Sequence, residues 1–195
     1  MTDTQPLYDL APVLEVMLLG LVIALGPLMW VWARNRRSSP MRRLQALTVL
    51  TLFLTFDLVL FGAFTRLTDS GLGCPDWPGC YGSASPVGAR SEITAAQEAM
   101  PTGPVTHGKA WVEMIHRYLA TGVGVLIIVL TFSSWVQQRR ARKGHGDAPP
   151  LSPWWPTLTL LWVCLQGAFG ALTVTMKLFP AIVTLHLIGG LVLLA

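Results

Sequence analysis

Long apolar stretches alternate with polar segments along most of the chain. A stretch of about 20 apolar residues is long enough to cross the hydrocarbon core of a bilayer as a helix. Such stretches occupy residues 13–33, 44–64, 111–136 and 156–174, and a fifth begins at Ala181. The pattern predicts an all-α polytopic membrane protein, with an antiparallel four-helix transmembrane bundle over residues 44–195 and one extra transmembrane helix within residues 1–43.

The composition agrees with a membrane location. Of the 195 residues, 52% are hydrophobic and 12% are charged, whereas about 25% of the residues in a typical soluble domain are charged. The fifth apolar stretch has 15 residues and reaches Ala195 without a polar flank, which is too short for a full crossing. We therefore expect the chain to be a partial one, truncated at the C-terminal end of the bundle.

Basic residues predict the orientation, because Lys and Arg gather on the cytoplasmic side of membrane helices. Segments 34–43 and 137–153 are rich in them, whereas loop 65–110 has more acidic than basic residues. The first ten residues contain no basic residue, unlike a signal peptide or a mitochondrial presequence. We predict a bacterial inner-membrane protein with loop 65–110 in the periplasm. The net charge of +4 then reflects topology, and no nucleic-acid partner is expected, because the basic residues flank membrane helices.

The periplasmic loop contains Cys74 and Cys80 in the sequence GLGCPDWPGC. An oxidising compartment favours a disulfide, and the intervening prolines and glycine allow the chain to fold back far enough to form one. Such a disulfide would either stiffen the loop or open and close during turnover. A zinc site is not expected, because two thiols without a nearby histidine are too few ligands. Cys164 is predicted to be a small buried apolar residue.

Two histidines lie near the predicted outer ends of inward-running helices. His116 and His186 each follow the start of an apolar stretch by five residues, and each helix comes after a G-A-F-x-x-L-T segment, at residues 62–68 and 167–173. In an up-and-down bundle the two helices occupy diagonal corners, so both imidazoles can ligate haem iron from opposite faces. The open alternatives are hydrogen bonding between helices and proton transfer.

Other polar residues surround this pair. Glu113 precedes His116 by three residues, so it either lies beside a bound porphyrin or pairs with Arg117 at i, i+4. Arg66 is either a ligand for haem propionates or an interfacial anchor. Asp57 is a charge inside the membrane and is expected to be functional or paired. The remaining histidines, His107 and His145, are expected to be solvated.

The residues of this region resemble the N-terminal half of the haem A synthase family. Residues 65–72, TRLTDSGL, are similar to the family's T-R-L-T-x-S-G-L signature, and residues 113–117, EMIHR, to its E-x-x-H-R motif. His186 falls where the paired histidine is expected, and the loop of Cys74 and Cys80 is similar to the paired-cysteine loop of many bacterial members. The resemblance covers residues 44–195, so the first helix would be an addition to the family core.

The resemblance implies oxidation of a methyl group of haem O to the formyl group of haem A, for terminal oxidase assembly. His116 and His186 would be axial ligands of the substrate haem iron, with Arg66 and Arg117 also at the haem, and Glu113 would act beside the reacting methyl group. It also implies haem b in a second bundle that the sequence lacks, so full activity is expected only with that half. Haem O synthase, an electron donor and a second copy of the chain would be possible partners. The competing interpretations are a membrane b-type cytochrome and a haem or proton transporter.

Overall fold

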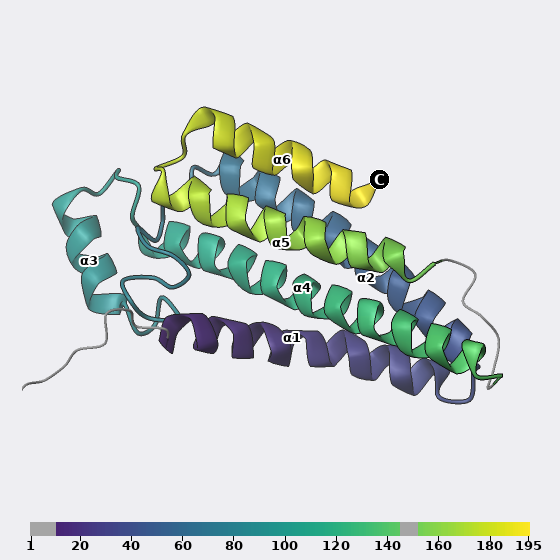
Figure 1. The fold of residues 1–195 in the computed structure, drawn as a ribbon. Helices are drawn as coiled ribbons and strands as arrows, with labels where there is room; N and C mark the ends of the chain where they lie inside the picture. The colour runs from purple at the N-terminus through teal and green to yellow at the C-terminus, as the bar shows by residue number, and fades with distance from the viewer. Residues whose placement is uncertain (1–10, 145–151) are drawn as a thin grey trace, which may run out of the picture.

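The computed structural model describes residues 11–144 and 152–195, and within these ranges all the regular elements are helices (Figure 1). The helices are α1 (Ala11–Asn35), α2 (Pro40–Leu67), α3 (Arg90–Ala99), α4 (His107–Arg142), α5 (Trp154–Thr175) and α6 (Pro180–Leu194). The predicted all-α fold is therefore confirmed.

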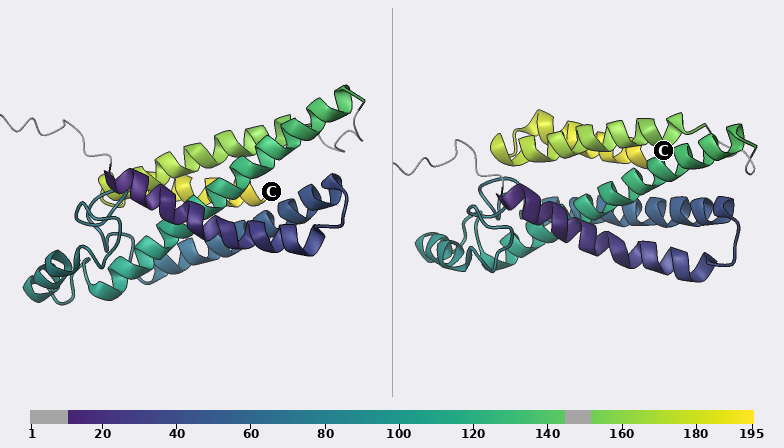
Figure 2. Two further views of the ribbon diagram at one scale, coloured as in Figure 1. Left: turned by 90° about the horizontal axis from the view of Figure 1, so that it is seen from below. Right: turned by 60° about the horizontal axis from the view of Figure 1, so that its bottom comes forward.

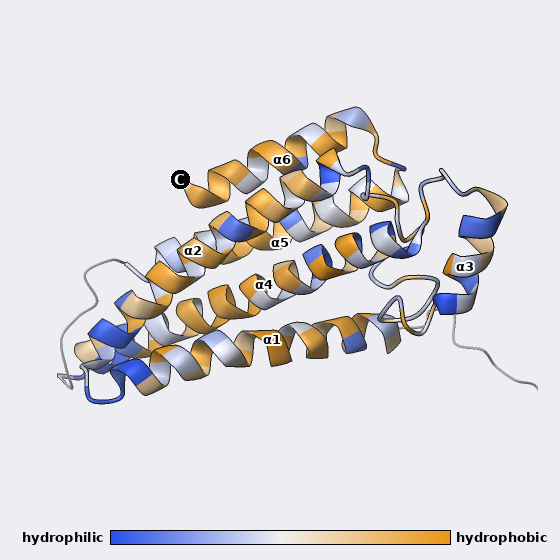
Figure 3. Ribbon diagram, turned by 180° about the vertical axis from the view of Figure 1, so that it is seen from behind, coloured by the Kyte–Doolittle hydropathy of each residue, from blue (hydrophilic) through white to orange (hydrophobic). Residues whose placement is uncertain are grey.

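Four of these helices, α1, α2, α4 and α5, are long and apolar enough to cross a membrane, whereas α6 is apolar but has 15 residues. Figure 3 shows the apolar residues along the helix bodies and the hydrophilic ones near the helix ends and in the segment that carries α3. Many large apolar side chains of α1, α2 and α5 are exposed on the outside of the molecule, as expected for surfaces in contact with lipid. The chain is a multi-pass membrane protein.

Helices α2, α4, α5 and α6 form a ring in which each helix contacts the next. In the described part of the chain α4 and α6 make no helix contact with each other, and neither do α2 and α5. The two histidine-bearing helices, α4 and α6, thus occupy diagonal corners. Helix α1 lies outside the ring against α4 and α2 (Figure 2).

Close packing attaches α1 to α4. A Cβ atom at Gly20 would lie 2.6 Å from the Cβ atom of Thr121, so only a glycine fits at this crossing. Further along the same contact, Ala24 and Val31 pack with Leu126 in a buried apolar cluster. Small residues let membrane helices approach closely, which increases their van der Waals contact.

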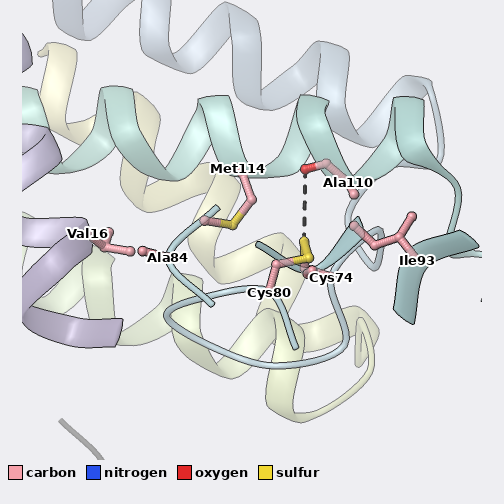
Figure 4. Close-up of a cluster of buried hydrophobic side chains, with 8 residues drawn as sticks. Val16, Cys74, Cys80, Ala84, Ile93, Ala110 and Met114 are labelled. Atoms are coloured by element: carbon pink, nitrogen blue, oxygen red, sulfur yellow. Dashed lines mark hydrogen bonds between the residues drawn. A yellow bond between two sulfur atoms is a disulfide. The ribbon is translucent and has the colours of Figure 1, made fainter. Parts of the chain in front are cut away.

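Helix α3 was missed by the search for apolar stretches. It has ten residues, most of them polar or small, and one fully buried side chain, Ile93. Ile93 packs in a cluster with the two loop cysteines and Met114 of α4 (Figure 4). The other contacts of the helix with α4 are polar, between Thr94 or Gln97 and His107, so hydrophobic periodicity gives little sign of it.

Candidate functional site

The loop between α2 and α3 folds into a compact cap over the start of α4. Cys74 and Cys80 form the predicted disulfide, and both side chains are fully buried. The Asp76 carboxylate accepts hydrogen bonds from the backbone N–H groups of Tyr81 (2.6 Å) and Gly82 (2.7 Å), which closes the turn after the second cysteine. Figure 4 shows the cysteines against α4, with the Cys74 sulfur 3.9 Å from the carbonyl oxygen of Ala110.

Glu113 joins this loop to α4. Its side chain is 5% exposed, and its Oε2 accepts a hydrogen bond from the backbone N–H of Cys74 at 2.8 Å. Its Oε1 accepts from Nη2 of Arg117 at 2.5 Å, so the i, i+4 ion pair is present. Both carboxylate oxygens therefore have partners. The contact with Cys74 joins residues 39 positions apart, and nothing in the sequence predicts it.

Arg117 binds the other side of the same loop. Its Nη1 donates to the carbonyl oxygens of Asp76 (2.9 Å), Pro78 (3.1 Å) and Gly79. The guanidinium side chain is 9% exposed. The residues of the EMIHR segment thus hold both ends of the disulfide loop: a carboxylate binds an amide of the loop, and a guanidinium binds its carbonyl groups.

The imidazole of His116 lies inside the bundle next to α2. A Cβ atom at Gly62 would be 3.0 Å from its Cε1 atom, and its ring is nearly parallel to that of Phe61, with centroids 6.2 Å apart. Its Nδ1 is buried and has no hydrogen-bond partner among the described residues. The glycine provides the space that this ring requires.

The imidazole of His186 has a similar environment next to α5. A Cβ atom at Gly170 would be 3.5 Å from its Cε1 atom, and its Nδ1 is also buried without a partner in the described ranges. The sequence analysis missed Gln166, a buried residue of α5 whose side-chain amide is likewise unpaired there and packs against Gly189 of α6. The sequence could have indicated Gln166, because it is a polar side chain within an otherwise apolar helix.

These residues fit a haem. Burying a polar atom without a partner is costly, and His116 and His186 each contribute such an atom from diagonal helices. Each ring lies against a glycine of a neighbouring helix, which leaves room for the imidazole itself. Imidazole pairs on facing helices are a common way to hold an iron porphyrin in a bundle.

Other residues named in the sequence analysis differ in how exposed they are. Arg66 is exposed at the end of α2, and Asp57 is exposed in the middle of the same helix. His107 is the first residue of α4; it is partly buried and its Nε2 lies 2.9 Å from the Thr94 hydroxyl, so it is less solvated than predicted. The prediction for Cys164 is wrong: the thiol is free and exposed, because this side of α5 faces away from the bundle. His145 lies outside the described residues.

Fold and site together define a multi-pass helical membrane protein with a pair of inward histidines beneath a disulfide-bonded loop. The sequence model of the COX15-CtaA family, described as cytochrome oxidase assembly protein, matches residues 45–195. The chain belongs to this family.

Several curated relatives agree. The chain is 43% identical over 146 residues to the haem A synthase of Shewanella oneidensis, which covers 75% of the chain and 41% of the relative. It is 30% identical over 146 residues to the haem A synthase of Alkalihalophilus pseudofirmus, covering 74% and 41% respectively. The chain thus spans about two fifths of the length of these relatives. No solved structure matches the chain.

Proposed function

We propose that the chain is the substrate-haem half of a haem A synthase, an oxidoreductase that converts a methyl group of haem O to the formyl group of haem A for terminal oxidase assembly. The observation that carries the proposal is the pair of inward imidazoles on diagonal helices, each with a buried Nδ1 that has no partner among the described residues, beneath the loop held by Glu113 and Arg117. Similarity to proteins named haem A synthase supports the choice of substrate.

His116 and His186 are the proposed axial ligands of the haem iron. Neutral imidazole nitrogens are common iron ligands, and both rings already lie in the bundle interior. Arg66 is the proposed donor to the haem propionates, since it is exposed at the end of α2 and has no ion pair among the described residues. Arg117 contributes to the haem site through the loop, because its guanidinium already binds three loop carbonyls.

Glu113 is the proposed catalytic carboxylate. A fixed carboxylate near the reacting methyl group can stabilise developing positive charge or accept a proton from attacking water. Its partners Cys74 and Arg117 fix its orientation. The disulfide keeps the loop in place over this end of the bundle, and redox cycling of Cys74 and Cys80 is not required for that role.

The proposal includes a setting and partners for the reaction. The basic residues near the helix ends support a bacterial inner-membrane location with segments 34–43 and 137–153 in the cytoplasm and loop 65–110 in the periplasm. A second bundle with haem b would provide the path for electrons, haem O synthase would supply the substrate, and a separate electron donor would exchange electrons with haem b. A homo-oligomer is compatible with this arrangement. Catalysis is therefore expected of a chain that contains both halves.

The ligand assignment is tested by absorbance spectroscopy of the purified protein loaded with haem. We expect His116→Ala to lose the six-coordinate bis-histidine spectrum. The matched control is His107→Gln, which changes a histidine on the same helix that is hydrogen-bonded to Thr94 instead, and it should keep the spectrum. A bis-histidine spectrum retained by His116→Ala would refute the assignment.

The reaction is tested by extracting haems from membranes that contain haem O synthase and the complete two-half protein. Haem A, or its hydroxylated precursor, should accumulate with the wild type and not with Glu113→Ala. Bound haem b in both samples, without haem A, would identify an electron-transferring b-type cytochrome in place of a synthase.

A further inference from the structure

Asp57 is a carboxyl group in the middle of a membrane helix, and the proposed haem site does not use it. It lies 10 residues from Leu67 at one end of α2 and 17 residues from Pro40 at the other. At about 1.5 Å per residue these separations are about 15 and 25 Å. Because the hydrocarbon core is about 30 Å thick, Asp57 is near mid-membrane depth. Its side chain is exposed on the outside of the bundle.

Within residues 11–144 and 152–195, no basic side chain pairs with this carboxyl group. The ion pairs of the described residues are Lys109 with Asp69 and Arg117 with Glu113. Arg117 is also the one basic residue inside the predicted apolar stretches, and it is occupied by Glu113 and the loop carbonyls. A second copy of the chain would also have no free Lys or Arg inside these stretches, so it would not supply a cation at this depth.

A groove between α1 and α2 reaches Leu54, which is three residues before Asp57 on α2. It has a volume of about 290 Å³ and is lined by Gly26, Pro27, Trp30, Leu50 and Leu54. Asp57 follows Leu54 by three residues and Leu50 by seven, so all three lie on the same face of α2. Helix side chains tilt toward the N-terminus of their helix, which directs the Asp57 side chain toward the groove.

Gly26 makes this groove suitable for a helix. A Cβ atom at this position would meet nothing within 4 Å, so the glycine is not needed for packing inside the chain. Small residues at a membrane-helix surface let another helix approach closely. An intramembrane carboxylate is costly, and such groups usually pair with a partner in a neighbouring helix.

We propose that the groove between α1 and α2, together with Asp57, is a docking surface for an apolar transmembrane helix that carries one basic side chain at mid-membrane depth. The apolar groove contacts the body of the partner helix, and Asp57 pairs with its cation. This surface is on the outside of the bundle and is independent of the histidine site.

The test uses the 195-residue chain in lipid nanodiscs and synthetic apolar helical peptides of about 25 residues, long enough to span the bilayer. The peptides carry Lys, Leu or Glu at the centre. Cys164 is free and exposed, so it accepts a donor dye, and energy transfer to a peptide-borne acceptor reports binding. Intramembrane polar pairs measured elsewhere predict that the Lys peptide binds about 3-fold to 18-fold more tightly than the Leu peptide.

Variants of the chain distinguish the pairing of Asp57 with a cation from nonspecific binding of apolar peptides. Asp57→Asn should abolish the preference for Lys, and Asp57→Lys should transfer it to the Glu peptide. Gly26→Ile should weaken all three peptides by filling the groove. The control Asp69→Asn removes an exposed carboxylate elsewhere and should leave the preference unchanged.

Two results would overturn the proposal. One is equal binding of the Lys and Leu peptides to the wild type, or a Lys preference that survives Asp57→Asn. The other is energy transfer between labelled copies of the chain that Gly26→Ile abolishes in the absence of peptide, because a second copy would then occupy the groove.

Discussion

Glu113→Ala should release the disulfide loop from α4. The substitution removes the acceptor of the Cys74 N–H and the charge partner of Arg117 in one step. Both side chains of the ion pair are almost fully buried, with exposed fractions of 5% for Glu113 and 9% for Arg117. The helix itself should persist, because alanine is a better helix former than glutamate.

The size of the effect follows from these contacts. Removing one partner of a buried ion pair costs about 3–5 kcal/mol, mainly because the remaining charge loses its compensation. Arg117 keeps its carbonyl acceptors at Asp76, Pro78 and Gly79, which favours the lower end of that range. The unpaired Cys74 N–H adds about 1 kcal/mol. A total of about 4 kcal/mol raises the equilibrium constant for loop opening by roughly 1,000-fold.

Hydrogen–deuterium exchange measures this opening. The exchange of the Cys74 amide in the wild type is compared with that in Glu113→Ala, in Glu113→Gln, which keeps an acceptor oxygen, and in Asp69→Asn. The last variant breaks an ion pair whose acidic partner is 73% exposed, and such pairs contribute at most about 1 kcal/mol. We expect the Cys74 amide to exchange fastest in Glu113→Ala, more slowly in Glu113→Gln and slowest in Asp69→Asn. Exchange in Glu113→Ala within threefold of the wild type, with unchanged helix content, would refute the reasoning.

Two further predictions concern packing and the loop. Gly20→Leu should destabilise the attachment of α1 by about 1–3 kcal/mol through overpacking against Thr121, as measured by SDS titration. Gly26→Leu should not, because a Cβ atom at this position meets nothing within 4 Å. An equal loss of stability in both variants would contradict the packing argument. Burial and the nearby Asp76 carboxylate raise the pKa of the Tyr81 phenol above its ordinary value, so Asp76→Asn should lower that pKa, because a neutral amide no longer disfavours the phenolate. Ultraviolet titration with Tyr81→Phe as the baseline measures this shift, and a higher pKa would show the sign to be wrong.

The helices could be predicted because their lengths follow from bilayer thickness. The four long predicted stretches lie inside observed helices, whose ends extend beyond them by one to six residues. Capping residues explain part of this extension. At the start of α4, Thr106 accepts a hydrogen bond from the backbone N–H of Lys109 at 3.3 Å, so the helix begins at His107 and not at Trp111. His116 therefore follows the start of its helix by nine residues, whereas His186 follows Pro180, the first residue of α6, by six.

The parts that escaped prediction depend on long-range contacts. Helix α3 is held by the buried side chain of Ile93 and by hydrogen bonds of Thr94 and Gln97 with His107, and the sequence has no periodic signal for it. Cys164 was expected to be buried because apolar helices of soluble proteins have buried cysteines, but in a bilayer the outside of a helix is as apolar as its inside. Hydropathy therefore cannot tell which side of α5 faces the bundle.

The two acidic residues inside the membrane helices show the same limit. Sequence alone treats Glu113 and Asp57 alike, as costly intramembrane charges that are functional by default. The fold separates them: Glu113 is buried with a partner for each oxygen, whereas Asp57 is exposed and unpaired among the described residues. For Glu113 the ion pair and the proposed catalytic role are compatible, since the contacts that hold the loop also orient the carboxylate. For Asp57 the described residues provide no compensation, and the proposed partner is a basic side chain on a further membrane helix.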